Sequence, residues 1–213
     1  MLKVLMPSLK YIVDNEYAFV KTKETECIIN TLLKGLKSES SPVLLQVSGI
    51  PGAGKSTYCQ KYKQDNFLYL SFDNIMLLLK DYQSDVVFLG SEEAFKRHEM
   101  KARIIGYELL SRALSMRLNI MFEHSGTNDA HVELFKNIPN YGYKTMVNFI
   151  TCNIESAIRR AKIRGEETKR YTPEKLIIER AEKFDYYVKE YQKIVTEIKI
   201  LDGVNNFSSL KEI

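Results

Sequence analysis

The sequence has few cysteines, no long apolar run and little net charge. Its cysteines, Cys27, Cys59 and Cys152, are scattered without CxxC spacing, so neither a disulfide framework nor a zinc site is expected. No apolar run approaches the roughly 18 residues that span a bilayer. The stretch from Met1 to Lys10 lacks the apolar core and cleavage site of a signal peptide. We therefore expect a reduced, cytoplasmic protein with no membrane partner.

Charge and composition narrow the functional class further. Lys and Arg total 31 against 27 for Asp and Glu, and a net charge of +4 does not by itself indicate nucleic-acid binding. Apolar residues make up 45% of the chain and charged residues 27%, a balance typical of a soluble globular protein. A length of 213 residues allows one well-buried core. We expect residues 1–213 to form a single domain.

The chain begins with a predicted helical extension, residues 1–42. Apolar residues between Thr25 and Leu36 recur at the spacing of an amphipathic helix. A polar break from Lys37 to Pro42 separates this extension from the rest of the chain.

Short apolar strands and helices alternate after the break. The predicted strands are Val43–Val47, Phe67–Phe72, Asn119–Phe122, Lys144–Ile150 and Glu197–Leu201. The predicted helices are Ser56–Asp65, Ile75–Lys80, Glu92–Met116, Ala130–Asn137, Ile154–Ile163 and Pro173–Val195. Such alternation predicts an α/β fold, a three-layer sandwich around a five-stranded parallel sheet with right-handed crossovers.

A phosphate-binding loop lies between the first strand and the next helix. The segment matches G-x-x-x-x-G-K-[ST], in which glycines let backbone amides turn toward phosphates at a helix N-terminus. We expect Lys55 to bridge the β- and γ-phosphates of ATP and Ser56 to ligate Mg²⁺. The predicted ATP-binding residues are Gly49, Ile50, Pro51, Gly52, Ala53, Gly54, Lys55, Ser56 and Thr57.

Other phosphate-binding classes fit less well. The chain has no HRD or DFG pattern of protein kinases and no N-K-x-D motif of small GTPases. Motor and AAA-type NTPases need larger bodies. A compact kinase that transfers phosphate from ATP to a small acceptor fits best, with a non-catalytic ATP-binding regulatory module as the alternative from another class.

Two acidic residues are candidates for the transfer chemistry. Asp73 follows the second strand and Glu123 the third, where the carboxyl ends of parallel strands face the ligand crevice. Asp73 is the predicted general base, with an N-cap of the following helix as the structural alternative. Glu123 is predicted to hold the acceptor or to act through water on Mg²⁺, with capping of the next helix as its alternative. His124, a lone histidine in a polar loop, receives no catalytic role.

The segment 159–172 is predicted to be a lid. Its basic run holds Arg159, Arg160, Arg164 and Arg170, and Gly165 with the polar residues after it is expected to break the helix. Arg160 and Arg164 share a helix face. A solvated basic surface is the structural alternative.

These motifs resemble the zeta toxin family and related polynucleotide-kinase-like P-loop kinases. The resemblance spans Val43 to Arg180 and includes the phosphate loop, Asp73, the segment from Glu123 to Gly126 and Thr127, and Arg170-Tyr171-Thr172-Pro173-Glu174. It implies that Lys55 binds phosphate and Asp73 is the base. Glu123 and Thr127 would contact the acceptor, and Arg160 and Arg170 would stabilise the transferring phosphoryl group. Either Arg159 or Arg160 would be the first lid arginine.

The sequence also departs from these relatives. His124 and Ser125 interrupt the Glu-Gly-Thr pattern, and Met76 replaces the arginine of the polynucleotide-kinase Asp-x-x-Arg motif. The resemblance implies a small-molecule acceptor such as a UDP-amino sugar and an inhibitory antitoxin protein as partner. The alternative is a polynucleotide 5′-hydroxyl kinase, in which tyrosines would stack on bases; the candidates are Tyr58, Tyr62, Tyr69 and Tyr82.

Overall fold

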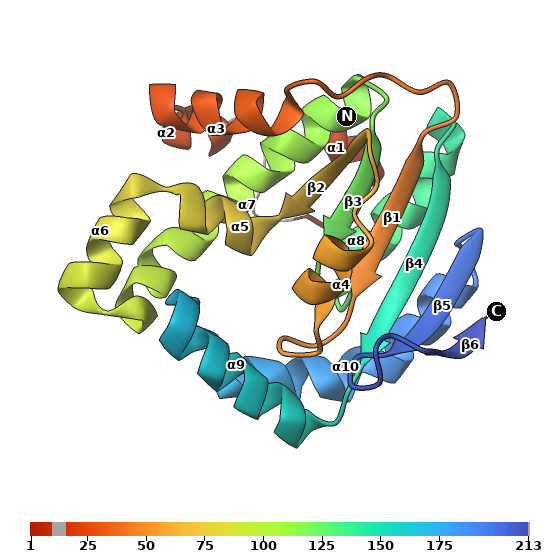
Figure 1. Ribbon diagram of the computed structural model, residues 1–213. Helices are drawn as coiled ribbons and strands as arrows, with labels where there is room; N and C mark the ends of the chain where they lie inside the picture. The colour runs from red at the N-terminus through yellow and green to blue at the C-terminus, as the bar shows by residue number, and fades with distance from the viewer. Residues whose placement is uncertain (10–15, 213) are drawn as a thin grey trace.

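The fold is built on one six-stranded sheet. The structure is a computed structural model that describes residues 1–9 and 16–212. The strands are β1 (Val43–Ser48), β2 (Phe67–Ser71), β3 (Asn119–Glu123), β4 (Lys144–Thr151), β5 (Glu197–Asp202) and β6 (Ser209–Glu212). Their order is β2-β3-β1-β4-β5-β6, and β1 to β5 are mutually parallel (Figure 1). The predicted α/β class and its five parallel strands are confirmed.

The sixth strand was not predicted. β6 is antiparallel to β5 and completes a hairpin at the edge of the sheet. Its four residues, Ser-Leu-Lys-Glu, form no apolar run, so their sequence does not indicate a strand. An edge strand of this kind depends on backbone pairing more than on buried side chains. A count of five strands was therefore wrong by one.

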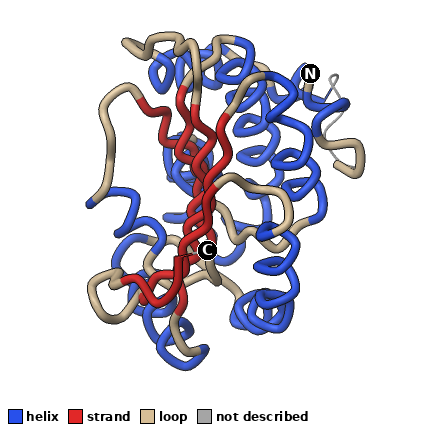
Figure 2. The backbone as a smooth tube through the Cα atoms, turned by 90° about the vertical axis from the view of Figure 1, so that its right-hand side faces the viewer, coloured by secondary structure: helices blue, strands red, loops and turns tan. Residues whose placement is uncertain are grey.

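Helices cover both faces of the sheet (Figure 2). On β1, the side chain of Leu44 joins the larger apolar core with α7 (Ser91–Ser115), α8 (Asp129–Asn137) and α10 (Glu174–Gln192). Leu45 and Val47 join a second core on the opposite face with Cys59 of α4 (Lys55–Lys61) and Ala157 of α9 (Ile154–Thr168). Neighbouring residues of a strand point to opposite faces, so β1 is buried on both sides, as a three-layer sandwich requires.

The N-terminal extension packs on the larger core. It contains α1 (Leu2–Leu5), α2 (Glu16–Val20) and α3 (Lys23–Leu33). Thr22 and Thr25 form a capping box, so α3 begins earlier than the predicted helix. The helix also ends earlier than predicted, at Leu33. The predicted extension, 1–42, includes residues 10–15, which lie outside the described residues.

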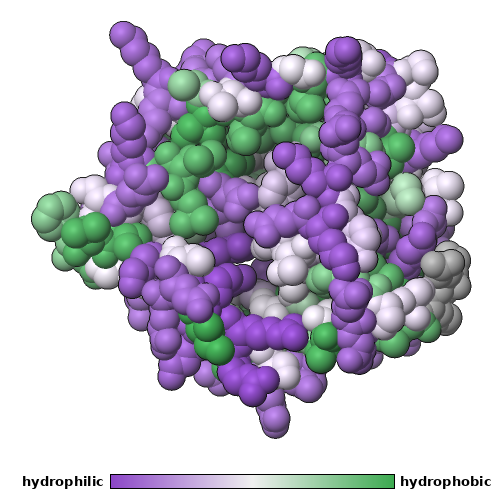
Figure 3. Space-filling model, in the orientation of Figure 1, coloured by the Kyte–Doolittle hydropathy of each residue, from purple (hydrophilic) through white to green (hydrophobic). Residues whose placement is uncertain are grey.

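A helical arm follows β2. It comprises α5 (Phe72–Leu78), α6 (Lys80–Leu89) and the start of α7. The short helix predicted at 75–80 begins earlier, and α6 was not predicted because its sequence, KDYQSDVVFL, has weak helical periodicity. Val87 and Phe88 of α6 are exposed. Hydrophobic side chains protrude at the left of Figure 3, on the side where Figure 1 shows α6. A 3-10 turn (Ile138–Tyr141) joins α8 to β4.

The predicted lid is more helical than expected. α9 continues through Gly165 to Thr168 and ends where Lys169 adopts a left-handed conformation with φ 59°. Glycine inside a helix costs only about 1 kcal/mol, which the burial of Ala157 and Ala161 on the same helix can offset. The prediction of a break at Gly165 was wrong. The link from α9 to α10 is residues 169–173.

Candidate active site

The loop from Gly49 to Gly54 wraps around the end of β1. Gly49, Gly52 and Gly54 have φ of 148°, 87° and 104°. A Cβ at Gly52 would lie 2.1 Å from the backbone oxygen of Ala157, so the loop packs directly on the first turns of α9. α4 begins immediately at Lys55. The loop therefore presents its backbone amides at a helix N-terminus, as phosphate binding requires.

Lys55 reaches back across this loop. Its Nζ donates a hydrogen bond to the Ile50 carbonyl oxygen over 3.1 Å. Desolvation lowers the pKa of Lys55 to about 8, Glu123 opposes this shift, and the Arg170 cation contributes to it. An anion placed in the loop would favour the charged ammonium, so the site is suited to phosphate.

Glu123 lies at the centre of the site. It is the last residue of β3 and pairs in register with Ser71 of the neighbouring strand β2. Its carboxylate accepts hydrogen bonds from Ser56 Oγ over 2.8 Å and from the Tyr69 hydroxyl. Glu123 does not cap α8, because Asn128 accepts the hydrogen bond from the Ala130 amide. Its side chain therefore faces the phosphate loop.

Asp73 lies in the first turn of α5, two residues after the N-cap Ser71. The N-cap alternative for Asp73 was therefore wrong by position, because the helix begins at Phe72 and not at Asn74. Desolvation raises the pKa of Asp73, but the Arg170 guanidinium outweighs it and holds the pKa below its ordinary value. The carboxylate is thus ionised and lines the same cavity as Lys55.

Arg170 joins these groups. It lies in the link after α9, is buried, and is ion-paired with Asp73. Its guanidinium donates to Ser56 Oγ over 3.2 Å and lies 3.7 Å from a Glu123 oxygen. Its Nε is buried and has no hydrogen-bond partner among the described residues. Four separate segments therefore meet at one polar cluster, formed by Lys55 and Ser56 of α4 with Asp73, Glu123 and Arg170.

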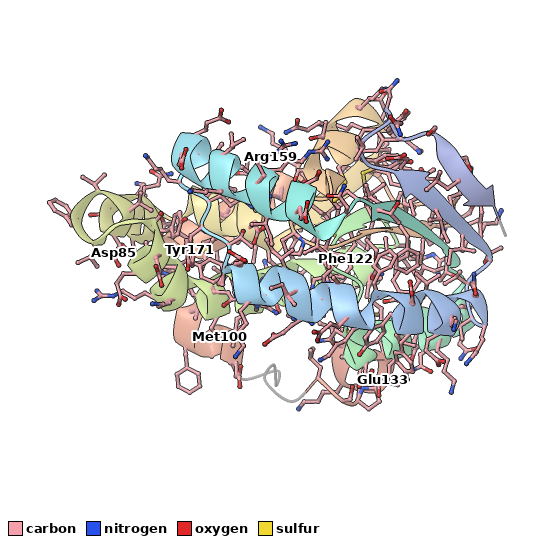
Figure 4. The ribbon with its side chains drawn as sticks, turned by 90° about the horizontal axis from the view of Figure 1, so that it is seen from below. Asp85, Met100, Phe122, Glu133, Arg159 and Tyr171 are labelled. Carbon is pink, nitrogen blue, oxygen red and sulfur yellow. The ribbon has the colours of Figure 1, made fainter. Side chains whose placement is uncertain are left out.

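The other predicted lid arginines differ in position. Arg160 donates to the Gly203 carbonyl oxygen over 3.0 Å, and Arg164 donates to Thr172 Oγ1 over 2.8 Å. Arg159 is exposed; it is labelled on α9 in Figure 4, where α9 and α10 run side by side. Arg160 and Arg164 therefore face the site, whereas Arg159 does not line either of the cavities described next.

Two cavities meet at this cluster. One, of about 350 Å³, lies at the phosphate loop and is lined by Gly52, Gly54, Thr57, Arg160 and Phe207 among others. The other, of about 110 Å³, lies between the helical arm and the α9–α10 link. Lys55, Glu123 and Arg164 line both. Figure 3 shows hydrophilic side chains gathered around the hollow near the centre of this face. We call the cavity at the phosphate loop the donor cavity, and the cavity between the helical arm and the α9–α10 link the acceptor cavity.

Several lining residues were not predicted from the sequence. Phe95, Glu99, Ala102 and Arg103 line the acceptor cavity from one face of α7, and Leu176 and Arg180 line it from α10. Their i, i+3 and i, i+4 spacing marks a helix face, but sequence alone does not show that this face meets the phosphate loop. Phe207 lies in the β5–β6 hairpin, which was missed with β6.

Thr127 and Glu123 were both predicted to contact the acceptor, but of the two only Glu123 lines the acceptor cavity. Thr127 is buried, and its backbone oxygen and Oγ1 accept hydrogen bonds from Arg180 over 2.8 and 3.1 Å. Arg180 lines the acceptor cavity, whereas Thr127 is not among its lining residues. The structure thus places Thr127 behind Arg180, as a group that orients it.

The residues present fit Mg²⁺ bound together with a nucleotide. Ser56 Oγ and the Glu123 carboxylate lie 2.8 Å apart and are oxygen donors, which Mg²⁺ prefers. Within residues 1–9 and 16–212, no group of three or more His, Cys, Asp or Glu side chains could hold a metal by itself. Magnesium commonly completes its octahedral shell with water and substrate phosphates. When bound, it would neutralise charge on the phosphates.

Comparison with known proteins decides the family. The zeta toxin family model matches residues 29–209. The chain belongs to the zeta toxin family. It is thus a P-loop kinase, and the resemblance noted in its motifs is confirmed. No helix in the described part of this zeta toxin family member has the length and apolar character needed to cross a membrane.

Individual proteins show similarity of different kinds. A putative bifunctional polynucleotide kinase/RNA ligase of Autographa californica nuclear polyhedrosis virus is 24% identical over 198 residues, covering 88% of this chain. The chain spans only 28% of that relative's length. A structure of the PezAT toxin–antitoxin system of Streptococcus pneumoniae has a TM-score of 0.67 and 20% identity, covering 90% of this chain and 81% of that one. AvrRxo1-ORF1:-ORF2 with ATP has a TM-score of 0.63 and 11% identity, covering 90% of this chain and 65% of that one.

Proposed function

We propose that this kinase transfers the γ-phosphate of ATP to a hydroxyl of a small acceptor. The main support is the meeting of the donor and acceptor cavities at Lys55, Glu123 and Arg164. A phosphoryl group passed between two substrates must lie where both can reach it, in line with the attacking and leaving oxygens. A module that only bound ATP would not need the second cavity.

Each charged residue has a role in this proposal. Lys55 and the loop amides bind the phosphates of ATP, and Ser56 with Glu123 would hold Mg²⁺. Asp73 accepts the proton of the acceptor hydroxyl; its ion pair with Arg170 must loosen when substrates bind, since a free carboxylate oxygen is needed. Arg170 is then released toward the transferring group. Arg160 is proposed to act from the donor side.

The charge of the acceptor cavity supports an anionic acceptor. Its lining includes the cations Lys55, Arg103, Arg164, Arg170 and Arg180 against the anions Asp73, Glu99 and Glu123. Arg103 is paired with Glu99 at 2.6 Å, whereas Arg180 donates hydrogen bonds to neutral atoms of Thr127. Guanidinium groups bind phosphate bidentately. A UDP-amino sugar, as the family resemblance implies, would place its diphosphate near Arg180.

The polynucleotide 5′-hydroxyl kinase is the second candidate, favoured by the viral relative. Its strand would also be anionic, but the proposed stacking platform is incomplete. Tyr82 is buried and donates to the Lys169 carbonyl oxygen, and the Tyr69 hydroxyl is bonded to Glu123. Tyr58 and Tyr62 pack on Phe207 beside the donor cavity. A small acceptor therefore suits the site better.

Incubation with γ-labelled ATP and a panel of acceptors tests this function. The panel is UDP-N-acetylglucosamine, nucleosides and 5′-hydroxyl oligonucleotides, with Lys55→Ala as the inactive control. We expect label on the UDP-sugar and none with Lys55→Ala, because the loop then loses its only side-chain cation. Label on the oligonucleotide alone would favour the second candidate. ATP binding without transfer to any acceptor would identify the regulatory module.

We also propose an inhibitory antitoxin partner, supported by the similarity to a toxin–antitoxin structure. Production of the wild-type chain alone in a bacterial host should arrest growth, and Lys55→Ala should not. Normal growth with soluble, active wild-type protein would contradict a toxin role.

A further inference from the structure

A buried hydrogen-bonded chain leads from α7 to the acceptor cavity. The Tyr107 hydroxyl lies 2.8 Å from His131 Nε2, and His131 Nδ1 lies 2.8 Å from His124 Nδ1. Tyr107 is 3% exposed and His131 is fully buried, while His124 lines the acceptor cavity beside Glu123. None of these three residues has a part in the phosphoryl-transfer roles given above.

The backbone fixes the direction of this chain. The Gly126 amide donates to His124 Nδ1 over 3.2 Å, so that nitrogen holds a lone pair and no proton. His131 must therefore donate from its own Nδ1, which leaves its Nε2 to accept from the Tyr107 hydroxyl. The Gly126 amide and the His131 Nδ1–H then share the single lone pair of His124 Nδ1, with His131 the closer donor. His124 is left with its proton on Nε2.

His124 borders the acceptor cavity. It is one of the residues that line this cavity, and the rings of Phe72 and Phe122 pack on it. Its Nδ1 is engaged by the Gly126 amide and by His131 Nδ1. The Nε2–H is therefore the ring group left to meet a ligand in the cavity.

The hydrogen-bond geometry keeps His124 neutral, because its Nδ1 accepts hydrogen bonds and so carries no proton. Desolvation, with the cations Arg103 and Arg180, lowers the pKa of His131 to about 3. A neutral imidazole with one defined tautomer donates a single, directed hydrogen bond.

We propose that His124 binds the acceptor through its Nε2–H, donating to an oxygen atom of that substrate, and that Tyr107 and His131 are positioning residues that fix this tautomer. The inference rests on the proposed function in one respect, that the cavity holds the acceptor. It adds a directional, uncharged contact beside the arginines and carboxylates of this cavity. Such a contact selects a carbonyl or hydroxyl oxygen at a defined place, which charge alone does not.

The tautomer can be measured without knowing the acceptor. Long-range ¹H–¹⁵N NMR distinguishes Nδ1–H from Nε2–H, and only His98, His124 and His131 contribute signals. We expect His124 in the Nε2–H form and His131 in the Nδ1–H form. In Tyr107→Phe, which keeps the ring against Phe72, both preferences should weaken. An Nδ1–H form of His124 in the wild type would overturn the proposal.

Kinetics test the contact itself, using the panel acceptor that the wild type phosphorylates. His124→Phe should raise the acceptor KM about 10-fold with little change in the KM for ATP, because one hydrogen bond to the acceptor is lost. His124→Gln, whose amide can donate from a similar place, should recover part of the loss. Tyr107→Phe should raise the same KM a few-fold. The matched control is Tyr143→Phe, which removes another buried hydroxyl, bonded to the Leu118 carbonyl oxygen, and should have no effect.

The two proposals fail in different ways. If the wild type phosphorylates an acceptor but His124→Phe and Tyr107→Phe keep its KM, the role of His124 is refuted and the kinase function stands. If no acceptor is phosphorylated, the proposed function fails. The NMR result then still supports or refutes the fixed tautomer. If the ¹⁵N chemical shifts of His124 do not change on addition of UDP-N-acetylglucosamine, the proposed contact with that acceptor is refuted.

Discussion

The Arg170 guanidinium is ion-paired with the Asp73 carboxylate, which joins the α9–α10 link to the first turn of α5. The same guanidinium donates to Ser56 Oγ and lies near Glu123. Arg170 thus contacts the proposed base and both proposed magnesium-site residues. Binding of Mg²⁺ and ATP must move Arg170 away from these partners. The conformation of the α9–α10 link therefore depends on whether the site is occupied.

Arg170→Ala should lower kcat by roughly 10³- to 10⁵-fold, the effect of an arginine that stabilises the transferring phosphoryl group. ATP affinity should change much less. Arg170→Lys should recover only part of the rate, since a point charge lacks the planar fork. Steady-state kinetics with titration calorimetry for ATP would separate the two quantities. Exposed Arg159 provides the control, and Arg159→Ala should behave as wild type.

Asp73→Asn should lower kcat by about 10²- to 10⁴-fold, the range for loss of a general base. The amide cannot accept the acceptor proton, and it also loses the charge that pairs with Arg170. We expect the Kd for ATP to stay within a few-fold of wild type. A variant with normal kcat and a lower Tm would show that Asp73 only stabilises the fold.

Arg164 and Arg160 make different contributions in our prediction. Arg164 lines both cavities and has a buried, unpartnered Nε, whereas Arg160 lines only the donor cavity. Arg164→Ala should therefore raise the acceptor KM and lower kcat, while Arg160→Ala should lower kcat with the acceptor KM unchanged. Initial rates over a grid of both substrates measure this. A normal kcat for Arg160→Ala would remove it as the first lid arginine.

Stability should fall in mildly acidic solution because of His131. Its pKa is about 3 in the folded protein and 6.5 ordinarily, since burial opposes its charge. Between these pH values the unfolded chain binds a proton that the folded chain does not, so the free energy of unfolding decreases as pH falls from about 6.5 toward 3. Urea titrations at several pH values would show the slope. His131→Gln should flatten it, and an equal slope in that variant would assign it to other groups.

Much of the fold was predictable because its determinants are local. Each parallel strand is a short apolar run followed by a helix, and β1 with the GIPGAGKS turn and α4 forms a unit within 20 residues of chain. The weak points were also local. β6 has no apolar run, α6 has poor periodicity, and Gly165 was read as a helix end although packing of α9 carries the helix past it.

The sequence by itself determined which residue types were available for phosphate binding, namely Lys55, Ser56 and the glycines, because their spacing along the chain fixes their geometry. It also placed Asp73 and Glu123 at strand ends. Only the tertiary structure decided that Arg170 pairs with Asp73, that Arg180 lines the acceptor cavity with Thr127 behind it, and that Tyr107 and His131 lead to His124. These contacts join residues up to 97 positions apart, and their geometry depends on how helices pack on the sheet rather than on local spacing.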